Sequence, residues 1–479
     1  MSARVAISVC CALLLPWPRA AQASQALALD DVLASALRLH PLLVQARLQV
    51  TQADAAVLGA KGAFDPTLSA KGNVTPYGDY VLGKADVNLR QRTTLWGLSL
   101  VGGWRFGRGD IPVYKLEDKT SSGGQAYVGL ELPLLRGGAI DKARARLYRR
   151  RFGRDGARYL MQVVELALLR AGAQAYWKWV AAGRKLVIEQ RLLDIAKKRN
   201  VQLAEQVKSG ALPAIEQVDN QRTILKRQGA VIAARRALER AAIKLSLFYR
   251  DAAGKPQLPK LTQLPKSLPS SRAPDSAQLA RDIDHAVARR PQIAVLAAQA
   301  AAVAVTRRLA RNERLPKLSL ALGAEHDIGA EPYDSRRTDV LLGLSLRFPM
   351  LMRRARGKLA KAEAKLREIA AKRRWLADKI AAQVRDAYSA LRAAHEQLAV
   401  ARRERKVAHQ VEAGERARLR LGSSTLLTVN LREQLAASAD KRVVDALASY
   451  QRALADYNAV TARGFGIGSF TRAPARKGR

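Results

Sequence analysis

The stretch DDVLASALRLHP at residues 30–41 decides the fold, because the chain repeats it as RDIDHAVARRP at residues 281–291. Each copy ends in a proline, at a position suited to the first turn of a following helix. FDPTLS at 64–69 and RLPKLS at 314–319 then follow at the same offset. Landmarks that recur in one order predict an internal tandem repeat.

Two later landmarks extend the repeat toward the C-terminus. QAYWKW at 174–179 matches DAYSAL at 386–391, and SGALPAIEQV at 209–218 matches LGSSTLLTVN at 421–430. The first half carries additional residues before these landmarks, and those residues fall among strand signals. We therefore expect a longer extracellular hairpin or an additional strand pair in the first half.

The helical signals in each half have matching lengths. A long helical pattern covers about 141–209 and again about 354–421, each on the order of 100 Å at 1.5 Å per residue. Its apolar residues step by fours and threes, which is a coiled-coil stripe: Leu376, Ile380, Val384, Ala387, Leu391, Ala394, Leu398 and Ala401. A solvated helix bundle would show the same stripe, so periodicity alone leaves a bundle and a tunnel wall both open.

The strand signals favour the tunnel. LWGLSLVGGWRF at 95–106 alternates, with large apolar residues on one face and small or charged ones, including Arg105, on the other. Residues 340–348 repeat this alternation, with Arg347 on the small or charged face, and residues 318–322 form a third apolar face. This pattern is typical of a water-filled β-barrel in lipid, although a soluble sheet with one buried face gives the same signal strand by strand. So few strands cannot close a water-filled barrel within one chain, which predicts an oligomer.

The N-terminal residues predict export. A basic start at Arg4, an apolar run to Leu15, a proline break and the triplet Ala21-Gln22-Ala23 indicate a signal peptide over 1–23. The run is shorter than the ~20 residues of a membrane-spanning helix, so cleavage is favoured over anchoring. Both cysteines, Cys10 and Cys11, lie inside it, so we expect neither a disulfide nor a thiolate metal site in the mature chain. After residue 24, charges are expected to interrupt every long apolar stretch, which leaves strands as the means of membrane insertion.

The doubled order of short helix, proline-started helix, strand pair, very long helix, glycine turn and returning helix resembles the TolC-like outer-membrane efflux family. The resemblance covers about Leu27 to Thr461 and includes HPLLVQARL and RPQIAVLAAQ at helix starts and LPLLRGG and FPMLMRR after the last strands. The predicted domains are the signal peptide 1–23, a first repeat 24–254 (strands about 67–133, helical hairpin 141–250), a proline-rich connector 255–276, a second repeat 277–462 (strands about 317–349, helical hairpin 354–461) and a basic flexible tail 463–479.

The resemblance implies a mixed α/β membrane protein of the outer membrane with a large periplasmic portion. Each chain would contribute to a trimeric β-barrel that is continued by a long α-helical coiled-coil barrel. The partners implied are two further copies of the chain, a periplasmic adaptor, an inner-membrane pump or ABC exporter, and outer-membrane lipid. The function implied is a passive tunnel for efflux or type I secretion, and the cargo stays open among drugs, metal ions, peptides and proteins.

Some family positions carry over residue by residue. Gly210 and Gly422 match the periplasmic tips, where the adaptor docks. The family often places acids just after the tip glycine as a constriction, and Glu216 and Asp219 lie there in the first half. The matching residues of the second half are Thr428 and Leu431, which departs from an acidic ring. Together with Arg105 and Arg347 as lumen-facing basic residues, this departure leads to the hypothesis of an anion-preferring channel.

Other function classes are less well supported. Five histidines without a second ligand at zinc spacing predict neither an enzyme nor a metal site, and no cofactor is expected. A formal net charge of +42 would ordinarily suggest nucleic-acid binding, but export and the mixing of arginines with acids along helices argue against it. The remaining alternative is an exported periplasmic structural coiled-coil protein without channel activity.

Overall fold

The structure, a computed structural model, describes residues 26–110, 119–265, 267, 269–329 and 338–463. The signal peptide predicted over 1–23 and nearly all of the predicted tail lie outside these residues. The chain divides into two compact units. The first, which we call the hairpin unit, comprises residues up to Ala36, Gly172–Arg272 and His395–Gln451. The second, the sheet unit, comprises Leu37–Ala171, Ala273–Ala394 and the residues from Arg452.

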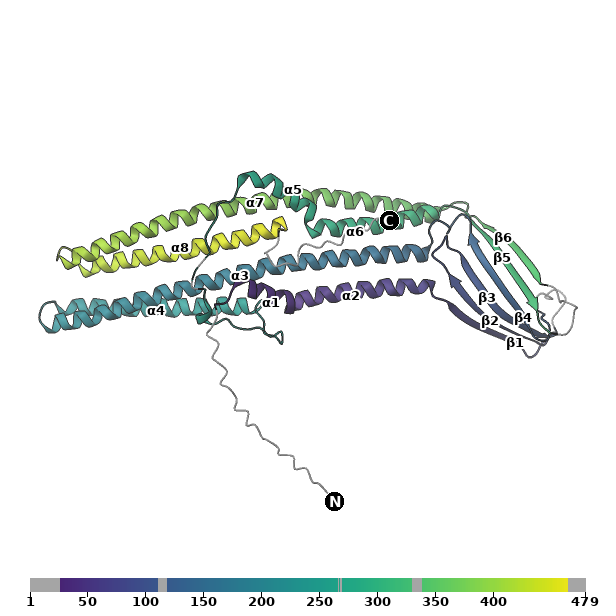
Figure 1. The fold of residues 1–479 in the computed structure, drawn as a ribbon, viewed down its shortest axis with the longest axis horizontal. Helices are drawn as coiled ribbons and strands as arrows, with labels where there is room; N and C mark the ends of the chain where they lie inside the picture. Colours follow the sequence, from purple (N-terminus) through teal and green to yellow (C-terminus); the bar gives the residue numbers. More distant parts are fainter. Residues whose placement is uncertain (1–25, 111–118, 266, 268, 330–337, 464–479) are drawn as a thin grey trace, which may run out of the picture. The chain divides into compact units, whose positions relative to one another are not determined.

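Helices of very different length alternate along the chain (Figure 1). The short and medium helices are α1 (Leu29–Leu39), α2 (Pro41–Lys61), α5 (Leu279–Arg289) and α6 (Pro291–Asn312). The long helices are α3 (Lys142–Lys208), α4 (Ala214–Ser246), α7 (Arg353–Arg420) and α8 (Leu426–Thr461). Pro41 and Pro291 occupy the first turns of α2 and α6, where a missing N–H costs no helical hydrogen bond.

The sheet unit contains one antiparallel sheet in the order β1-β2-β3-β4-β5-β6. Its strands are β1 (Thr67–Thr75), β2 (Leu82–Arg92), β3 (Ser99–Gly109), β4 (Gln125–Pro133), β5 (Lys317–Asp327) and β6 (Asp339–Arg347). The first half of the chain therefore supplies β1–β4 and the second half β5–β6. The additional residues of the first half form an additional strand pair.

One strand begins later than the sequence pattern predicts. The alternation was expected to start at Leu95, but Thr93–Leu98 form a tight turn, closed by the Thr93 N–H donating to the Leu98 carbonyl at 2.8 Å. Trp96 and Gly97 both adopt left-handed backbone conformations, with φ of 50° and 75°. Two such residues in succession reverse the chain between antiparallel strands, so β3 starts at Ser99.

The expectation that charges interrupt every long apolar stretch is wrong for one segment. Among the described residues, the helical stretch Ser276–Asn312 is long and apolar enough to cross a membrane by length and composition. The cause is the uncharged, alanine-rich run from Pro291 to Thr306 in α6. Helix α6 also buries Ile293, Val295 and Ala298 within the sheet unit.

The core of the hairpin unit holds the proline-rich connector in place. Trp179 and Leu245 are fully buried there together with Val32. Leu264 of the connector packs against this cluster, and the Leu27 N–H donates to the Gln263 carbonyl at 2.9 Å. The described residues of the connector are extended apart from the short 3-10 turn Leu261–Gln263 and the start of a second one, Ser276–Gln278, as the proline content predicts.

Candidate channel wall and hairpin tips

The sheet has one polar and one apolar face. The register pairs Asp86 with Arg105, Arg105 with Gln125 and Gln125 with Asp327, so these side chains share one face. With alternation along each strand, the charged members of this polar face are Lys71, Lys84, Asp86, Arg90, Arg92, Arg105, Glu131, Lys317, Glu325, Asp327, Asp339 and Arg347. The face therefore carries both signs of charge.

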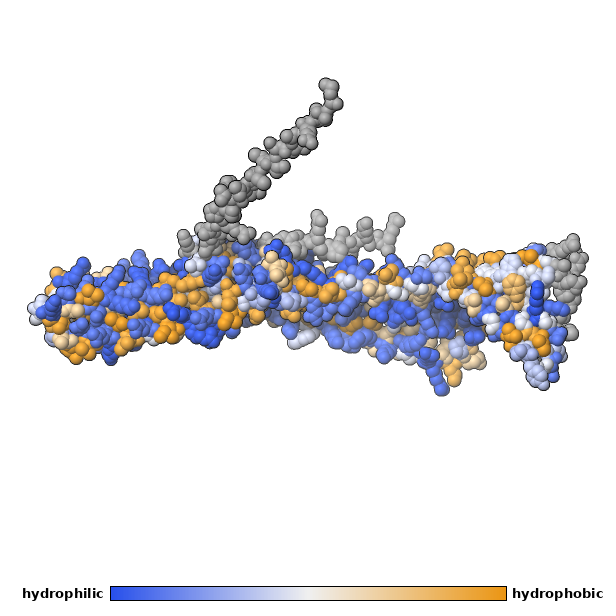
Figure 2. Space-filling view, turned by 90° about the horizontal axis from the view of Figure 1, so that it is seen from below, coloured by the Kyte–Doolittle hydropathy of each residue, from blue (hydrophilic) through white to orange (hydrophobic). Residues whose placement is uncertain are grey.

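The opposite face is apolar and open. Its large members are Leu68, Val74, Val87, Leu89, Leu100, Trp104, Phe106, Val128, Leu130, Leu132, Leu318, Leu320, Leu322, Val340, Leu342, Leu344 and Leu346. Val340 is 78% exposed and Leu342 is 72% exposed. On the side of the molecule drawn in Figure 2, hydrophobic patches lie over the sheet beside paler and hydrophilic ones. A contiguous apolar surface of this kind needs a cover of lipid or protein.

The structure places the predicted basic residues, Arg105 and Arg347, on the polar face, but their surroundings differ. The Arg105 guanidinium lies 3.9 Å from the Asp86 carboxylate, 5.2 Å from the centre of the Tyr127 ring, and donates to Gln125 at 3.2 Å. Arg347 pairs in register with Lys317 and forms no ion pair with a described residue. The charge of Arg105 is thus locally compensated, whereas that of Arg347 is not.

Both predicted tip glycines end a long helix in the same way. Gly210 has φ of 74° and Gly422 has φ of 75°. At the first tip the Ala211 N–H donates to the Gln206 carbonyl at 2.8 Å, and at the second the Ser423 N–H donates to the Arg418 carbonyl at 2.9 Å. This is the Schellman arrangement, in which a left-handed residue satisfies the last carbonyls of a helix. No atom lies within 4 Å of a Cβ built at either glycine, so backbone conformation alone demands glycine here.

The candidate constriction residues lie in the first two turns of the returning helices. Asp219, in α4 close to Glu216, pairs with Arg222 at 3.1 Å. In α8 the Thr428 N–H donates at 3.3 Å to the hydroxyl of Thr425, which caps the helix, and Leu431 is 52% exposed. Among the described residues, no hydrogen bond or ion pair joins Glu216 or Asp219 to Thr428 or Leu431, so their role in a constriction stays a prediction.

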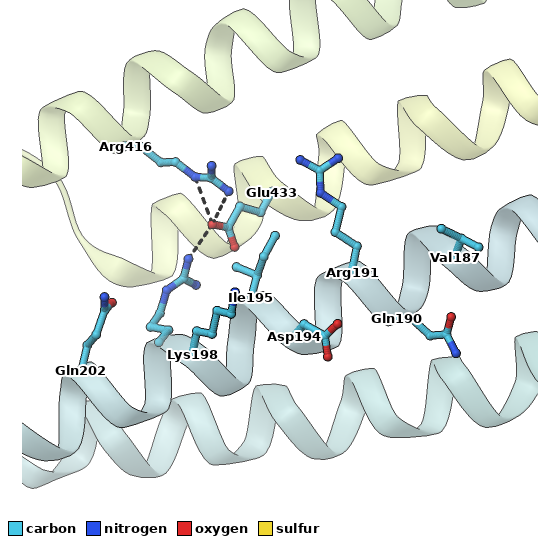
Figure 3. Close-up of a pocket in the computed structure, with 10 residues that line it drawn as sticks. Val187, Gln190, Arg191, Asp194, Ile195, Lys198, Gln202, Arg416 and Glu433 are labelled. Carbon is cyan, nitrogen blue, oxygen red and sulfur yellow. Dashed lines mark hydrogen bonds and ion pairs between the residues drawn. The ribbon is translucent and has the colours of Figure 1, made fainter. Parts of the chain in front are cut away.

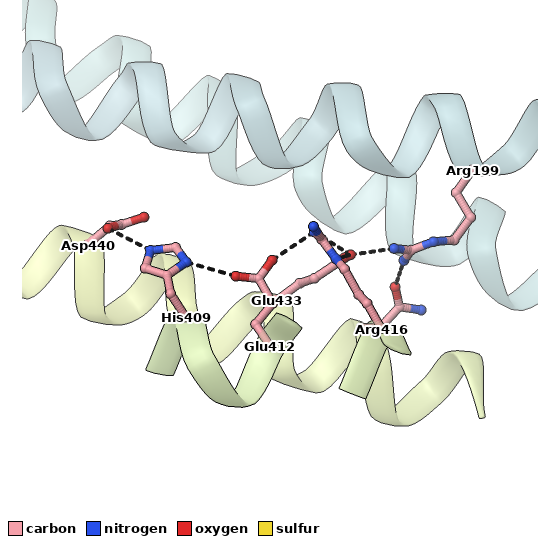
Figure 4. A network of polar contacts seen from close by, with 7 residues as sticks. Arg199, His409, Glu412, Arg416, Glu433 and Asp440 are labelled. Carbon is pink, nitrogen blue, oxygen red and sulfur yellow. Dashed lines mark hydrogen bonds and ion pairs between the residues drawn. The ribbon is translucent and has the colours of Figure 1, made fainter. Parts of the chain in front are cut away.

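The hairpin unit contains a network of charged groups that the sequence patterns did not reveal (Figure 4). Glu433 of α8 accepts from Arg199 of α3 and from Arg416 of α7, the latter at 2.9 Å, and its side chain is only 5% exposed. Arg416 also meets Glu412 at 2.7 Å. Glu412 and Arg416 are four residues apart on one helix, and this spacing alone indicates an ion pair between them. It does not indicate their partners on other helices, Arg199 and Glu433.

His409 extends this network of charged groups. Its Nδ1 lies 2.9 Å from Glu412 and its Nε2 lies 3.1 Å from Asp440 of α8. The hydrogen bond to Asp440 raises the pKa of His409, burial opposes that rise, and the bond to Glu412 adds to it. The imidazole is therefore biased toward its charged form, in which both nitrogens donate.

An open groove borders the same network. Arg191, Asp194 and Lys198 line it along one side of α3, with Arg416 and Glu433 at its edge (Figure 3). Its volume is about 690 Å³. Charges of both signs alternate along its wall, and among the described residues no group of three or more His, Cys, Asp or Glu side chains is placed to hold a metal ion. The arrangement suits packing against another polar surface.

A family model described as outer membrane efflux protein matches residues 32–248 and 283–462. Among solved structures, the outer membrane protein VceC from Vibrio cholerae is similar with a TM-score of 0.63 at 14% identity, covering 90% of this chain and 95% of that chain. The open-state MtrE outer membrane channel of Neisseria gonorrhoeae gives a TM-score of 0.61 at 16% identity, covering 90% and 88%. The Campylobacter jejuni CmeC outer membrane channel gives 0.61 at 15% identity, covering 91% and 86%. No curated protein sequence matches the chain.

Proposed function

The chain belongs to the outer membrane efflux protein family, and from this premise we propose that three copies form one passive tunnel that works with a periplasmic adaptor and an inner-membrane pump or ABC exporter. The family and the fold establish that the protein is a TolC-like outer-membrane efflux channel with long helices and a large periplasmic portion. The family is one of channels and not of enzymes.

The two-faced sheet is the observation that carries the proposal of a trimeric barrel. Its strands have 9 or 11 residues, which is the length of a tilted strand that crosses a bilayer. The apolar face would meet lipid and the polar face would line water. The outer strands, β1 and β6, each have one partner, so pairing β6 of one copy with β1 of the next would remove both free edges.

The tips carry the proposal of adaptor docking. Gly210 and Gly422 close both hairpins with the same exposed turn, and the exposed Leu421 and Leu427 flank the second one. Glu216 and Asp219 with Thr428 and Leu431 are proposed to face the lumen near this constriction. We further propose that the chain consists of two repeats, 24–254 and 277–462, joined by the connector 255–276. The paired order of helices supports this division.

The oligomeric state tests the proposal most directly. The full chain, purified in mild detergent, is expected to have the mass of three copies, and the same preparation should conduct ions after insertion into a planar bilayer. A stable monomer that inserts and conducts would refute the trimer. A wild-type trimer that stays intact but does not conduct would instead favour a periplasmic structural role.

A second experiment tests the orientation. Single cysteines at Ser209 or Ser423 are expected to crosslink to the adaptor in whole cells. The matched control is a cysteine at Ser99, where β3 begins, which should not react with the adaptor. Crosslinking from Ser99 alone would contradict docking at the glycine tips.

A further inference from the structure

Exposed arginines gather where the helices of the sheet unit meet the sheet. Helix α6 ends just before β5, α7 begins just after β6, and α3 begins soon after β4. We call the exposed basic side chains at these connections the junction cluster: Arg146, Arg311, Arg314, Arg353, Arg354 and Arg356.

The nearby acids do not neutralise the junction cluster. Asp141 binds Arg144 at 2.7 Å, Glu313 binds Lys358 at 2.6 Å, and Glu131 lies 3.6 Å from Lys317. None of the six cluster residues forms an ion pair with a described residue. Their positive charge is therefore available to bind an anion that belongs to another molecule.

Large apolar side chains are exposed at the same edge of the sheet. Leu95 and Trp96, in the turn between β2 and β3, are 74% and 51% exposed. Met350 and Leu351, between β6 and α7, are 82% and 65% exposed. The antiparallel register brings the β2–β3 turn and the end of β6 to this one edge. The Trp96 ring also closes over Gly138, where an added Cβ would lie 2.6 Å from its Nε1.

Apolar anchors beside unpaired arginines are the combination that a lipid headgroup region recognises. Aromatic and long aliphatic side chains insert at the boundary of the acyl chains, while arginines extend to the phosphates. The headgroup layer is about 5–8 Å deep on each side of a bilayer, which corresponds to about five residues of helix. Arg311 lies six residues before the start of β5, and Arg353 and Arg354 lie six and seven residues after the end of β6, so all three are close to the strand ends.

We propose that the junction cluster binds the anionic headgroups of phospholipids in the periplasmic leaflet of the outer membrane. This inference rests on the proposed insertion of the sheet into that membrane. The cluster then fixes the depth of the sheet in the bilayer. It also accounts for part of the basic excess of the chain without any nucleic-acid partner.

The test uses the full chain in a nonionic detergent and measures thermal unfolding while short-chain phosphatidylglycerol is titrated in. Each arginine near an anionic surface contributes about fivefold to affinity, so the variant Arg353→Gln/Arg354→Gln/Arg356→Gln should raise the half-saturating lipid concentration on the order of 100-fold. The matched control, Arg235→Gln/Arg236→Gln/Arg240→Gln, removes the same charge from exposed positions on α4 and should leave the half-saturating lipid concentration unchanged. The variant Arg353→Lys/Arg354→Lys/Arg356→Lys keeps the charge and should retain most of the response.

Three results would overturn the inference. They are equal stabilisation by short-chain phosphatidylethanolamine, equal stabilisation by inorganic phosphate, and an equal loss in the α4 control. Bilayer conductance of the wild type separates this inference from the proposed function. A wild type that conducts but shows no preference for phosphatidylglycerol defeats the inference alone, whereas a wild type that does not conduct defeats the proposed function.

Discussion

The two hairpin tips of the hairpin unit share one turn geometry but differ in what holds their helices together. At both tips a left-handed glycine closes a Schellman turn, at Gly210 between α3 and α4 and at Gly422 between α7 and α8. Behind the first turn, α4 packs on α3 through Asn220, which is 2% exposed and donates to the Ala196 carbonyl at 3.1 Å. Behind the second turn, charged groups dominate the contact.

Near its tip the second hairpin buries two acids, whereas the buried acid of the first hairpin, Glu189 of α3, lies far from Gly210 and pairs with Lys441. Glu415 and Glu433 are 7% and 5% exposed, and each has arginine partners. Burying a carboxylate is costly unless a cation accompanies it, so the stability of this hairpin depends on complete pairs. The same backbone turn can therefore be supported by a neutral hydrogen bond or by a charge network, and only the second responds strongly to charge removal.

The largest expected effect comes from breaking the network at its centre. Glu433→Gln leaves Arg199, whose side chain is only 13% exposed, without its carboxylate. We expect a loss of about 3 kcal/mol in the free energy of unfolding, measured by urea denaturation of the full chain in detergent. Glu404→Gln, which removes a 45% exposed acid paired with Arg442, should cost less than about 1 kcal/mol. Equal losses for the two variants would contradict the distinction between buried and exposed pairs.

A smaller effect tests what the tips share. Gly210→Ala and Gly422→Ala should each cost about 1 kcal/mol, because both positions need a left-handed backbone and both have open space around the added methyl group. The control Gly229→Ala, in the interior of α4 with open space, should stabilise the helix by up to about 1 kcal/mol. A clear difference between the two tips in the same denaturation assay would show that the turns are not equivalent.

These tips also show how far the sequence alone could go. Helical periodicity followed by glycine predicted both turns, since only a left-handed residue closes a helix this way. Alternation predicted the faces of the sheet because side chains alternate strictly along a strand. The start of β3 was missed because a tryptophan occupies a left-handed position that propensity assigns to Gly or Asn. The Arg199–Glu433 contact was missed because its partners are 234 residues apart.

The sheet allows the two halves of the chain to be compared in a channel measurement. Arg105 of the first half faces Asp86, whereas Arg347 of the second half pairs in register with another cation, Lys317. If the lumen prefers anions, Arg347→Gln should lower that preference in reversal potentials measured under a salt gradient. The paired variant Arg105→Gln/Asp86→Asn removes no net charge and should leave the potential unchanged. Cation preference in the wild type would defeat the hypothesis of anion preference.

The smallest expected effect concerns pH and again separates the two hairpins. His409 lies between Glu412 and Asp440, and Arg405 also approaches Asp440 at 4.0 Å. Because the hydrogen bond to Asp440 raises the pKa of His409 in the folded chain, the charged imidazole stabilises the fold at a pH below its ordinary value of 6.5. That contribution is lost as the pH rises through the raised folded value. The side chain is 40% exposed, so solvent screening limits the contribution to less than about 1 kcal/mol.

His409→Gln should therefore unfold more easily than the wild type at pH 5.5, and the difference in unfolding free energy should shrink steadily toward pH 8.5. Asn220→Ala in the first hairpin removes a hydrogen bond between neutral groups, so its cost should stay constant over the same range. A His409→Gln difference that grows with rising pH would mean that the neutral imidazole is the stabilising form. In that case the charge network would end at Glu412 and would not continue to α8 through His409.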